Sequence, residues 1–256
     1  MREFDELLEI IRKLRDPVRG CPWDIQQTHR SLIPNFIEEL YETVEAIERN
    51  DVEHLSEELG DLLLHILMQT QIACEHDEFT MEEVLQRISR KLLHRHPHVF
   101  GNYSTPDAQG VKMNWERIKK REKSRDSILD GIPTTMPALI TAQRIQEKAA
   151  AVGFDWHDSE PVLEKMDEEI DELKKALVSG SDDEIQKELG DILFTVVNLS
   201  RKLGYDAETC LRGSIRKFDK RFRAIENHFR KNKLDINEST LEQLDEIWNK
   251  IKKNNI

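Results

Sequence analysis

The chain has 256 residues, of which 34% are charged and 38% hydrophobic, and its net charge at pH 7 is −12. The acidic charge argues against direct binding of nucleic acid, which requires a basic surface, and no apolar run approaches the length of about 18 residues that a membrane span needs. The cysteines Cys21, Cys74 and Cys210 form no Cys-x-x-Cys pair and the N-terminus lacks an apolar signal segment, so we expect a cytoplasmic protein.

The first half of the chain predicts a helical hairpin. Apolar residues recur three or four positions apart from Leu40 to Ile47 and again from Leu59 to Leu67. Asn50-Asp51 between them favours a turn and the start of a new helix, and so short a connection makes the two helices antiparallel neighbours. A third helix is expected over about residues 81–94, because the residue before Pro97 avoids the helical region.

The second half repeats this arrangement. Helical spacing returns from Ile170 to Leu177 and from Leu189 to Val197, with Ser181-Asp182 as the turn. A third helix is again expected, over about residues 207–230. The composition changes around residues 130–137, which places a domain boundary there.

We therefore predict an all-α protein of two tandem modules, residues 1–128 and 129–256. A hairpin and one further helix cannot cover the apolar face formed by Leu62, Leu63, Ile66 and Leu67, or its copy. Four-helix-bundle packing would cover it. Such packing can arise between the two modules of one chain or between two chains, and we favour the dimer.

An acidic pattern, Glu-Glu-x-x-Glu followed by Glu-x-x-Asp, occurs twice. Each carboxylate of the second copy lies 130 residues after its counterpart. The sequence Glu-Leu-Gly-Asp at residues 58–61 also recurs at residues 188–191. A duplication of this kind argues against carboxylates that only solvate a helix face. The residues are Glu38, Glu39, Glu42, Glu58 and Asp61, and Glu168, Glu169, Glu172, Glu188 and Asp191.

The spacing of these carboxylates predicts a metal site in each module. Glu39 and Glu42 share one helix face, and Glu58 and Asp61 share another. With the turn near Asp51, Glu42 and Asp61 both lie about 14 Å from it, at the same height on antiparallel helices. Four carboxylates that meet there repel unless they are neutralised, and an all-oxygen ligand set is typical of Mg²⁺ or Mn²⁺. No histidine follows a glutamate by three residues, so the signature of a di-iron bundle is missing.

Basic and aromatic residues accompany both acidic copies. In each half a Lys and an Arg stand one turn apart on the third helix, and a Trp and a Lys stand one turn apart further on. Such pairs are suited to hold phosphate groups and to stack against a base or sugar. They are Lys91, Arg95, Trp115 and Lys119, and Lys217, Arg221, Trp248 and Lys252. The nearby run from His94 to His98 resembles a transition-metal site, but we interpret it as a helix end that carries a phosphate-facing Arg95.

Together these residues resemble the MazG family of nucleoside triphosphate pyrophosphohydrolases in its two-module form. The resemblance includes Gly20-Cys21-Pro22-Trp23-Asp24, residues 96–101 and Val152-Gly153-Phe154-Asp155-Trp156. It implies two MazG-like modules, homodimers, and a metal-dependent hydrolase that converts (d)NTPs to (d)NMPs and pyrophosphate. It also implies Mg²⁺ ligands at Glu169, Glu172, Glu188 and Asp191 and substrate contacts at Lys217, Arg221, Trp248 and Lys252, with the matching first-module residues in the same roles. His94 departs from the family, which often carries a second arginine there.

We expect attack of water at the α-phosphorus, with Glu38 or Glu168 as the group that accepts the proton, and a role in cleaning the nucleotide pool. Two alternatives stay open: a helical regulatory protein that senses nucleotide without turnover, and a pyrophosphatase. The chain has no Gly-x-x-x-x-Gly-Lys-Ser/Thr sequence, which excludes a P-loop enzyme.

Overall fold

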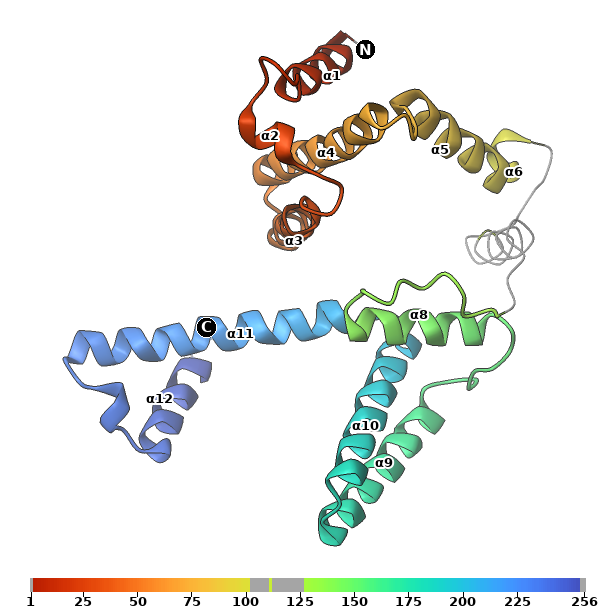
Figure 1. Cartoon of the computed structure of the whole chain (residues 1–256). Helices are drawn as coiled ribbons and strands as arrows, with labels where there is room; N and C mark the ends of the chain where they lie inside the picture. Colours follow the sequence, from red (N-terminus) through yellow and green to blue (C-terminus); the bar gives the residue numbers. More distant parts are fainter. Residues whose placement is uncertain (1, 102–110, 112–126, 254–256) are drawn as a thin grey trace. The chain divides into compact units, whose positions relative to one another are not determined.

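The structure is a computed structural model that describes residues 2–101, 111 and 127–253. It divides into two compact units, Met1–Gly110 and Val111–Ile256 (Figure 1). The described residues contain α-helices and one 3₁₀ turn but no strand, which confirms the all-α fold. None of these helices is both long and apolar enough to cross a membrane. The module boundary after residue 128 stays a prediction.

The first unit contains the expected hairpin and third helix. Its elements are α1 (Arg2–Leu14), α2 (Pro22–Gln26), α3 (Ile33–Arg49), α4 (Val52–Glu75), α5 (Met81–Arg95) and α6 (Pro97–Phe100). Asn50 adopts the left-handed conformation that ends α3, and the Asp51 side chain accepts a hydrogen bond from the backbone N–H of His54, which starts α4. Helix α5 ends at Arg95, two residues before Pro97, and Pro97 is the first residue of α6. Proline cannot continue a helix but fits the first turn of a new one.

The core of the first unit lies between α1 and α4. Ile11 and Leu32 are buried against Leu67, Met68 and Ile72. The expectation that Leu67 would lack a cover within its own module is therefore wrong, because α1 provides one. Its neighbour Ile66 lies on another face of α4 and is 44% exposed.

A buried arginine fixes the segment before α3. The guanidinium of Arg15 donates to the Glu75 carboxylate at 2.6 Å, at the end of α4, and to the backbone carbonyls of Asp24 and Gln27. Hydrogen bonding to Arg15 lowers the pKa of Glu75 against the effect of its burial. The Gly20–Asp24 motif is thus tied to the hairpin by one side chain.

The second unit has a similar hairpin with different surroundings. Its elements are α8 (Ala138–Ala150), α9 (Glu160–Ser179), α10 (Asp182–Lys202), α11 (Ala207–Asn232), the 3₁₀ turn η1 (Ile236–Glu238) and α12 (Leu241–Lys253). Gly180, with φ of 73°, ends α9, and the Ser181 side chain caps α10. In Figure 1, α8 lies across the end of the α9–α10 pair, α11 leaves in another direction, and α12 folds back beside α11.

Gly60 and Gly190 stand directly before the aspartate of each acidic copy. A Cβ atom at either position would meet no atom of the described structure within 4 Å. Close approach of helices within a unit therefore does not require these glycines.

Candidate metal centres

The first hairpin brings together three of the predicted ligands. Glu39 of α3 and Glu58 and Asp61 of α4 each place an oxygen within 4.8 Å of the others. We call this set the first centre. The sequence placed Glu42 at the height of Asp61, whereas in the structure Glu39 is the α3 residue that joins the close group. Glu42 is exposed and lies outside this close group.

The electrostatics of the first centre are dominated by crowded negative charge. Burial, together with the negative charges of Asp61, Glu42 and Glu58, raises the pKa of Glu39 to about 7. A carboxylate whose pKa is raised in this way holds a proton near neutral pH unless a cation replaces that proton.

The second hairpin forms the corresponding group. Glu169 and Glu172 of α9 and Glu188 of α10 lie with one oxygen each within 4.8 Å of one another. We call this set the second centre. Asp191 lies outside the close group, and the Lys187 ammonium is 3.9 Å from its carboxylate.

The two centres differ in the cations that the chain itself supplies. The Lys165 Nζ atom lies 2.8 Å from Glu169 and 3.0 Å from Glu168, and the Lys187 Nζ atom lies 3.1 Å from Glu188. Hydrogen bonds to Glu169 and then Glu168 raise the pKa of Lys165, and the hydrogen bond to Glu188 raises the pKa of Lys187. The matching positions of the first unit, 130 residues earlier, hold asparagine and glutamate. The second centre is therefore neutralised in part by lysine, whereas no lysine pairs with the first centre among the described residues.

Each centre contains one buried carboxylate oxygen without a hydrogen-bond partner among the described residues, which favours the binding of a cation there. Glu58 and Glu188 are only 5% and 7% exposed, and the Oε2 atom of each has no hydrogen-bond partner within the described part of the chain. A buried carboxylate is costly unless it is paired or ligates a metal ion. Because every donor in both centres is a carboxylate oxygen, a hard divalent cation fits them.

The predicted proton acceptors lie beside these groups. Glu38 and Glu168 are both exposed and belong to neither close group. Glu168 shares Lys165 with Glu169. Their catalytic role stays a prediction.

In the second unit, α11 and α12 bring two predicted substrate residues together. The guanidinium carbon of Arg221 lies 5.7 Å from the centroid of the Trp248 ring, an arrangement typical of a cation–π contact. The Phe218 ring centroid lies 5.3 Å from that of Trp248 and 5.9 Å from that of Phe222. The sequence analysis did not predict a role for either phenylalanine, although Phe218 directly follows Lys217 and Phe222 directly follows Arg221. Lys217 and Lys252 are exposed on the same two helices.

Only two of the four predicted substrate residues of the first unit lie in the described part of the chain. Lys91 is exposed and Arg95 half-buried on α5. The predicted partners Trp115 and Lys119 lie outside the described residues.

Comparison with known proteins identifies the family. The model of the MazG nucleotide pyrophosphohydrolase domain matches residues 27–100 and 158–225, which together make up more than half of the chain and contain every carboxylate of both acidic copies. The chain belongs to the MazG family. This confirms the resemblance seen in the sequence.

Full-length relatives agree with the family assignment. The chain is 46% identical over 252 residues to the nucleoside triphosphate pyrophosphohydrolase/pyrophosphatase MazG of Thermotoga maritima, covering 97% of this chain and 95% of that one. It is 41% identical over 263 aligned residues to the nucleoside triphosphate pyrophosphohydrolase of Escherichia coli K12, covering 100% and 99%. A solved MazG-related protein from Thermotoga maritima is 28% identical, covers 47% of this chain and 99% of its own, and superposes with a TM-score of 0.39.

The raised pKa of Glu39 gives a pH-dependence that can be measured. Proton and metal ion compete for the same oxygen, and the Glu39 pKa is about 7 in the metal-free protein. We expect cation affinity of the first centre to be highest above this pH and to fall by about tenfold for each pH unit below it. Calorimetric titration with Mn²⁺, on a chain carrying Glu172→Gln and Glu188→Gln, isolates the first centre. An affinity that does not change across this range would contradict the prediction.

Proposed function

We propose that this MazG-family protein hydrolyses (deoxy)ribonucleoside triphosphates at the α-phosphorus to nucleoside monophosphate and pyrophosphate. The observation that carries the proposal is the buried carboxylate group of each hairpin, with one oxygen left without a partner. The names of the full-length relatives, at 41% and 46% identity, support the reaction class. We further propose that the protein acts in the cytoplasm, where it clears the nucleotide pool.

The metal in this proposal is Mg²⁺, and Mn²⁺ satisfies the same ligand set. The ligands are Glu39, Glu42, Glu58 and Asp61 in the first unit and Glu169, Glu172, Glu188 and Asp191 in the second. When bound, the ion supplies Lewis acidity and neutralises charge on the phosphate oxygens.

The other proposed residues hold the substrate and move a proton. In the second unit Lys217, Arg221 and Lys252 bind the phosphates through charge-assisted hydrogen bonds, and Trp248 presents its ring to the base or sugar. Contact with Trp248 orients the Arg221 guanidinium before substrate arrives. Lys91, Arg95, Trp115 and Lys119 take these roles in the first unit.

The proton acceptor in this proposal is Glu38 or Glu168, which lies next to a ligand in sequence. Both are exposed, so an attacking water can reach them.

Product analysis tests the reaction. Purified protein is incubated with each (d)NTP and Mg²⁺ in water enriched in ¹⁸O, and the products are separated by ion exchange. We expect monophosphate and pyrophosphate in equal amounts, with the label in the monophosphate, because water attacks the α-phosphorus. Diphosphate and phosphate as products would refute the mechanism. Hydrolysis of pyrophosphate alone would favour a pyrophosphatase, and nucleotide binding without turnover would favour a sensor.

A further inference from the structure

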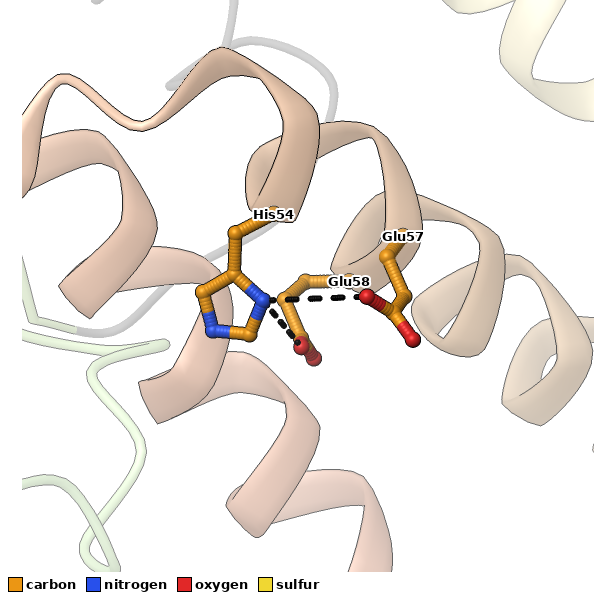
Figure 2. A group of neighbouring side chains, drawn as sticks. All are labelled: His54, Glu57 and Glu58. Atoms are coloured by element: carbon orange, nitrogen blue, oxygen red, sulfur yellow. Dashed lines mark ion pairs between the residues drawn. The ribbon is translucent and has the colours of Figure 1, made fainter.

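A histidine and two glutamates share one face of α4 near its start. His54, Glu57 and Glu58 are spaced three and four residues apart, and Figure 2 shows their side chains gathered on one side of the helix. The Nδ1 atom of His54 lies 3.2 Å from Glu58 Oε1 and 3.9 Å from Glu57 Oε2. One atom from each residue lies within 4.8 Å of the other two. Ligands bound at about 2.0–2.2 Å from a Zn²⁺ ion are roughly 3–4 Å apart, so these side chains are spaced for one cation without movement of the helix.

Glu58 is the buried member of this set. This side chain is 7% exposed, its Oε1 atom faces His54, and its Oε2 atom has no hydrogen-bond partner among the described residues. Glu58 also belongs to the first centre with Glu39 and Asp61. The two sets therefore meet at one buried carboxylate that can ligate on both sides. His54 and Glu57 have side chains that are 36% and 74% exposed, so an ion can enter from solvent.

The donor types differ between the two neighbouring sets. The first centre offers oxygen only, which suits Mg²⁺. His54 adds an imidazole nitrogen, a donor that favours borderline cations such as Zn²⁺, Co²⁺ or Ni²⁺. We propose that His54, Glu57 and Glu58 form a binding site for one such cation, beside the first centre and sharing Glu58 with it. The proposal rests on the proposed function only in the assignment of Glu58 as a Mg²⁺ ligand.

The second unit cannot form this site. The positions 130 residues after His54 and Glu57 hold Glu184 and Lys187. Glu184 accepts a hydrogen bond from the Ser179 hydroxyl at 2.9 Å, and the Lys187 ammonium already lies against Glu188. A fixed positive charge at this place excludes a second cation. We therefore expect one mixed nitrogen–oxygen site per chain, confined to the first unit.

Counting bound Zn²⁺ tests the proposal. The full chain is titrated with Zn²⁺ by calorimetry in excess Mg²⁺ and without nucleotide, and bound zinc is measured after dialysis. We expect the wild-type chain to bind one Zn²⁺. The variants His54→Ala and Glu57→Gln should each bind Zn²⁺ at least about tenfold more weakly, because each change removes a ligand. Both residues lie outside the apolar core, and far-ultraviolet circular dichroism confirms that each variant is folded.

Two control variants identify where the ion binds. His157→Ala removes an exposed histidine that lies 3.8 Å from Asp158, and it is expected to leave zinc binding unchanged. His96→Ala tests the histidine-rich end of α5. Wild-type zinc affinity in His54→Ala would overturn the proposal, as would a loss of zinc confined to His96→Ala. Because nucleotide is absent, failure here leaves the hydrolysis in Mg²⁺ untouched, and failure of that hydrolysis leaves the zinc count valid.

Discussion

Changing Glu58 and Glu188 to glutamine in one chain is expected to lower kcat/KM for NTP hydrolysis by at least about a hundredfold. The substitution keeps side-chain size but removes a buried negative ligand from each centre. A metal ion at such a site contributes several kcal/mol of charge stabilisation in the transition state, and each 1.36 kcal/mol corresponds to about a tenfold change in rate. Initial rates of pyrophosphate release, measured over a range of substrate and Mg²⁺ concentrations, provide the test.

The matched control uses the repeat itself. Glu53 and Asp183 occupy equivalent positions five residues before Glu58 and Glu188, and both are exposed near the starts of α4 and α10. Glu53→Gln with Asp183→Asn removes the same charge from the same helices and is expected to retain the rate. Wild-type turnover in the Glu58/Glu188 double variant would show that the two centres are not catalytic. The single variants then divide the activity between the units.

The sequence predicted the hairpins and their carboxylates because both depend on local geometry. A fixed rise per residue and a short turn at Asn50-Asp51 are enough to predict that carboxylates of the two helices meet. They placed Glu42 level with Asp61, whereas the structure groups Glu39 with Glu58 and Asp61. The cover of Leu67 by α1 depends instead on packing between distant segments, which periodicity does not specify. Arg15 was missed for the same reason, since its partner Glu75 is 60 residues away.

Differences between the two copies were harder to predict than their shared residues. The repeat drew attention to matched carboxylates, while Lys165 and Lys187 have no counterpart in the first unit. His54 was not predicted as a ligand because only one order of the two residue types along the helix, glutamate before histidine, was considered. A search for glutamate three residues before histidine excludes a di-iron bundle, but a histidine three or four residues before glutamate shares a helix face equally well.

Both hairpins leave equivalent apolar side chains exposed, which indicates a further partner surface. The pairs related by the 130-residue repeat are Leu40 and Ile170, Ile47 and Leu177, Leu59 and Leu189, and Ile66 and Val196. Full burial of one such side chain contributes about 1.5–3 kcal/mol. In the second unit, α9 and α10 carry the carboxylates, whereas α11 and α12, which carry Arg221 and Trp248, extend away from them (Figure 1). We therefore expect helices from elsewhere to cover the hairpin and to enclose a substrate.

We propose that a second copy of the chain supplies these helices, and we expect light scattering on dilute protein to give about twice the chain mass of 30.1 kDa. Ile47→Glu with Leu177→Glu should reduce this to the mass of one chain, because a charge would then be buried in each interface. Both side chains are more than half exposed, so each unit should still fold. Val178→Glu is the control, since it adds the same charge beside Leu177 on an even more exposed position. A wild-type protein that has the mass of one chain, and is helical and active, would contradict the dimer and favour pairing of the two units within one chain.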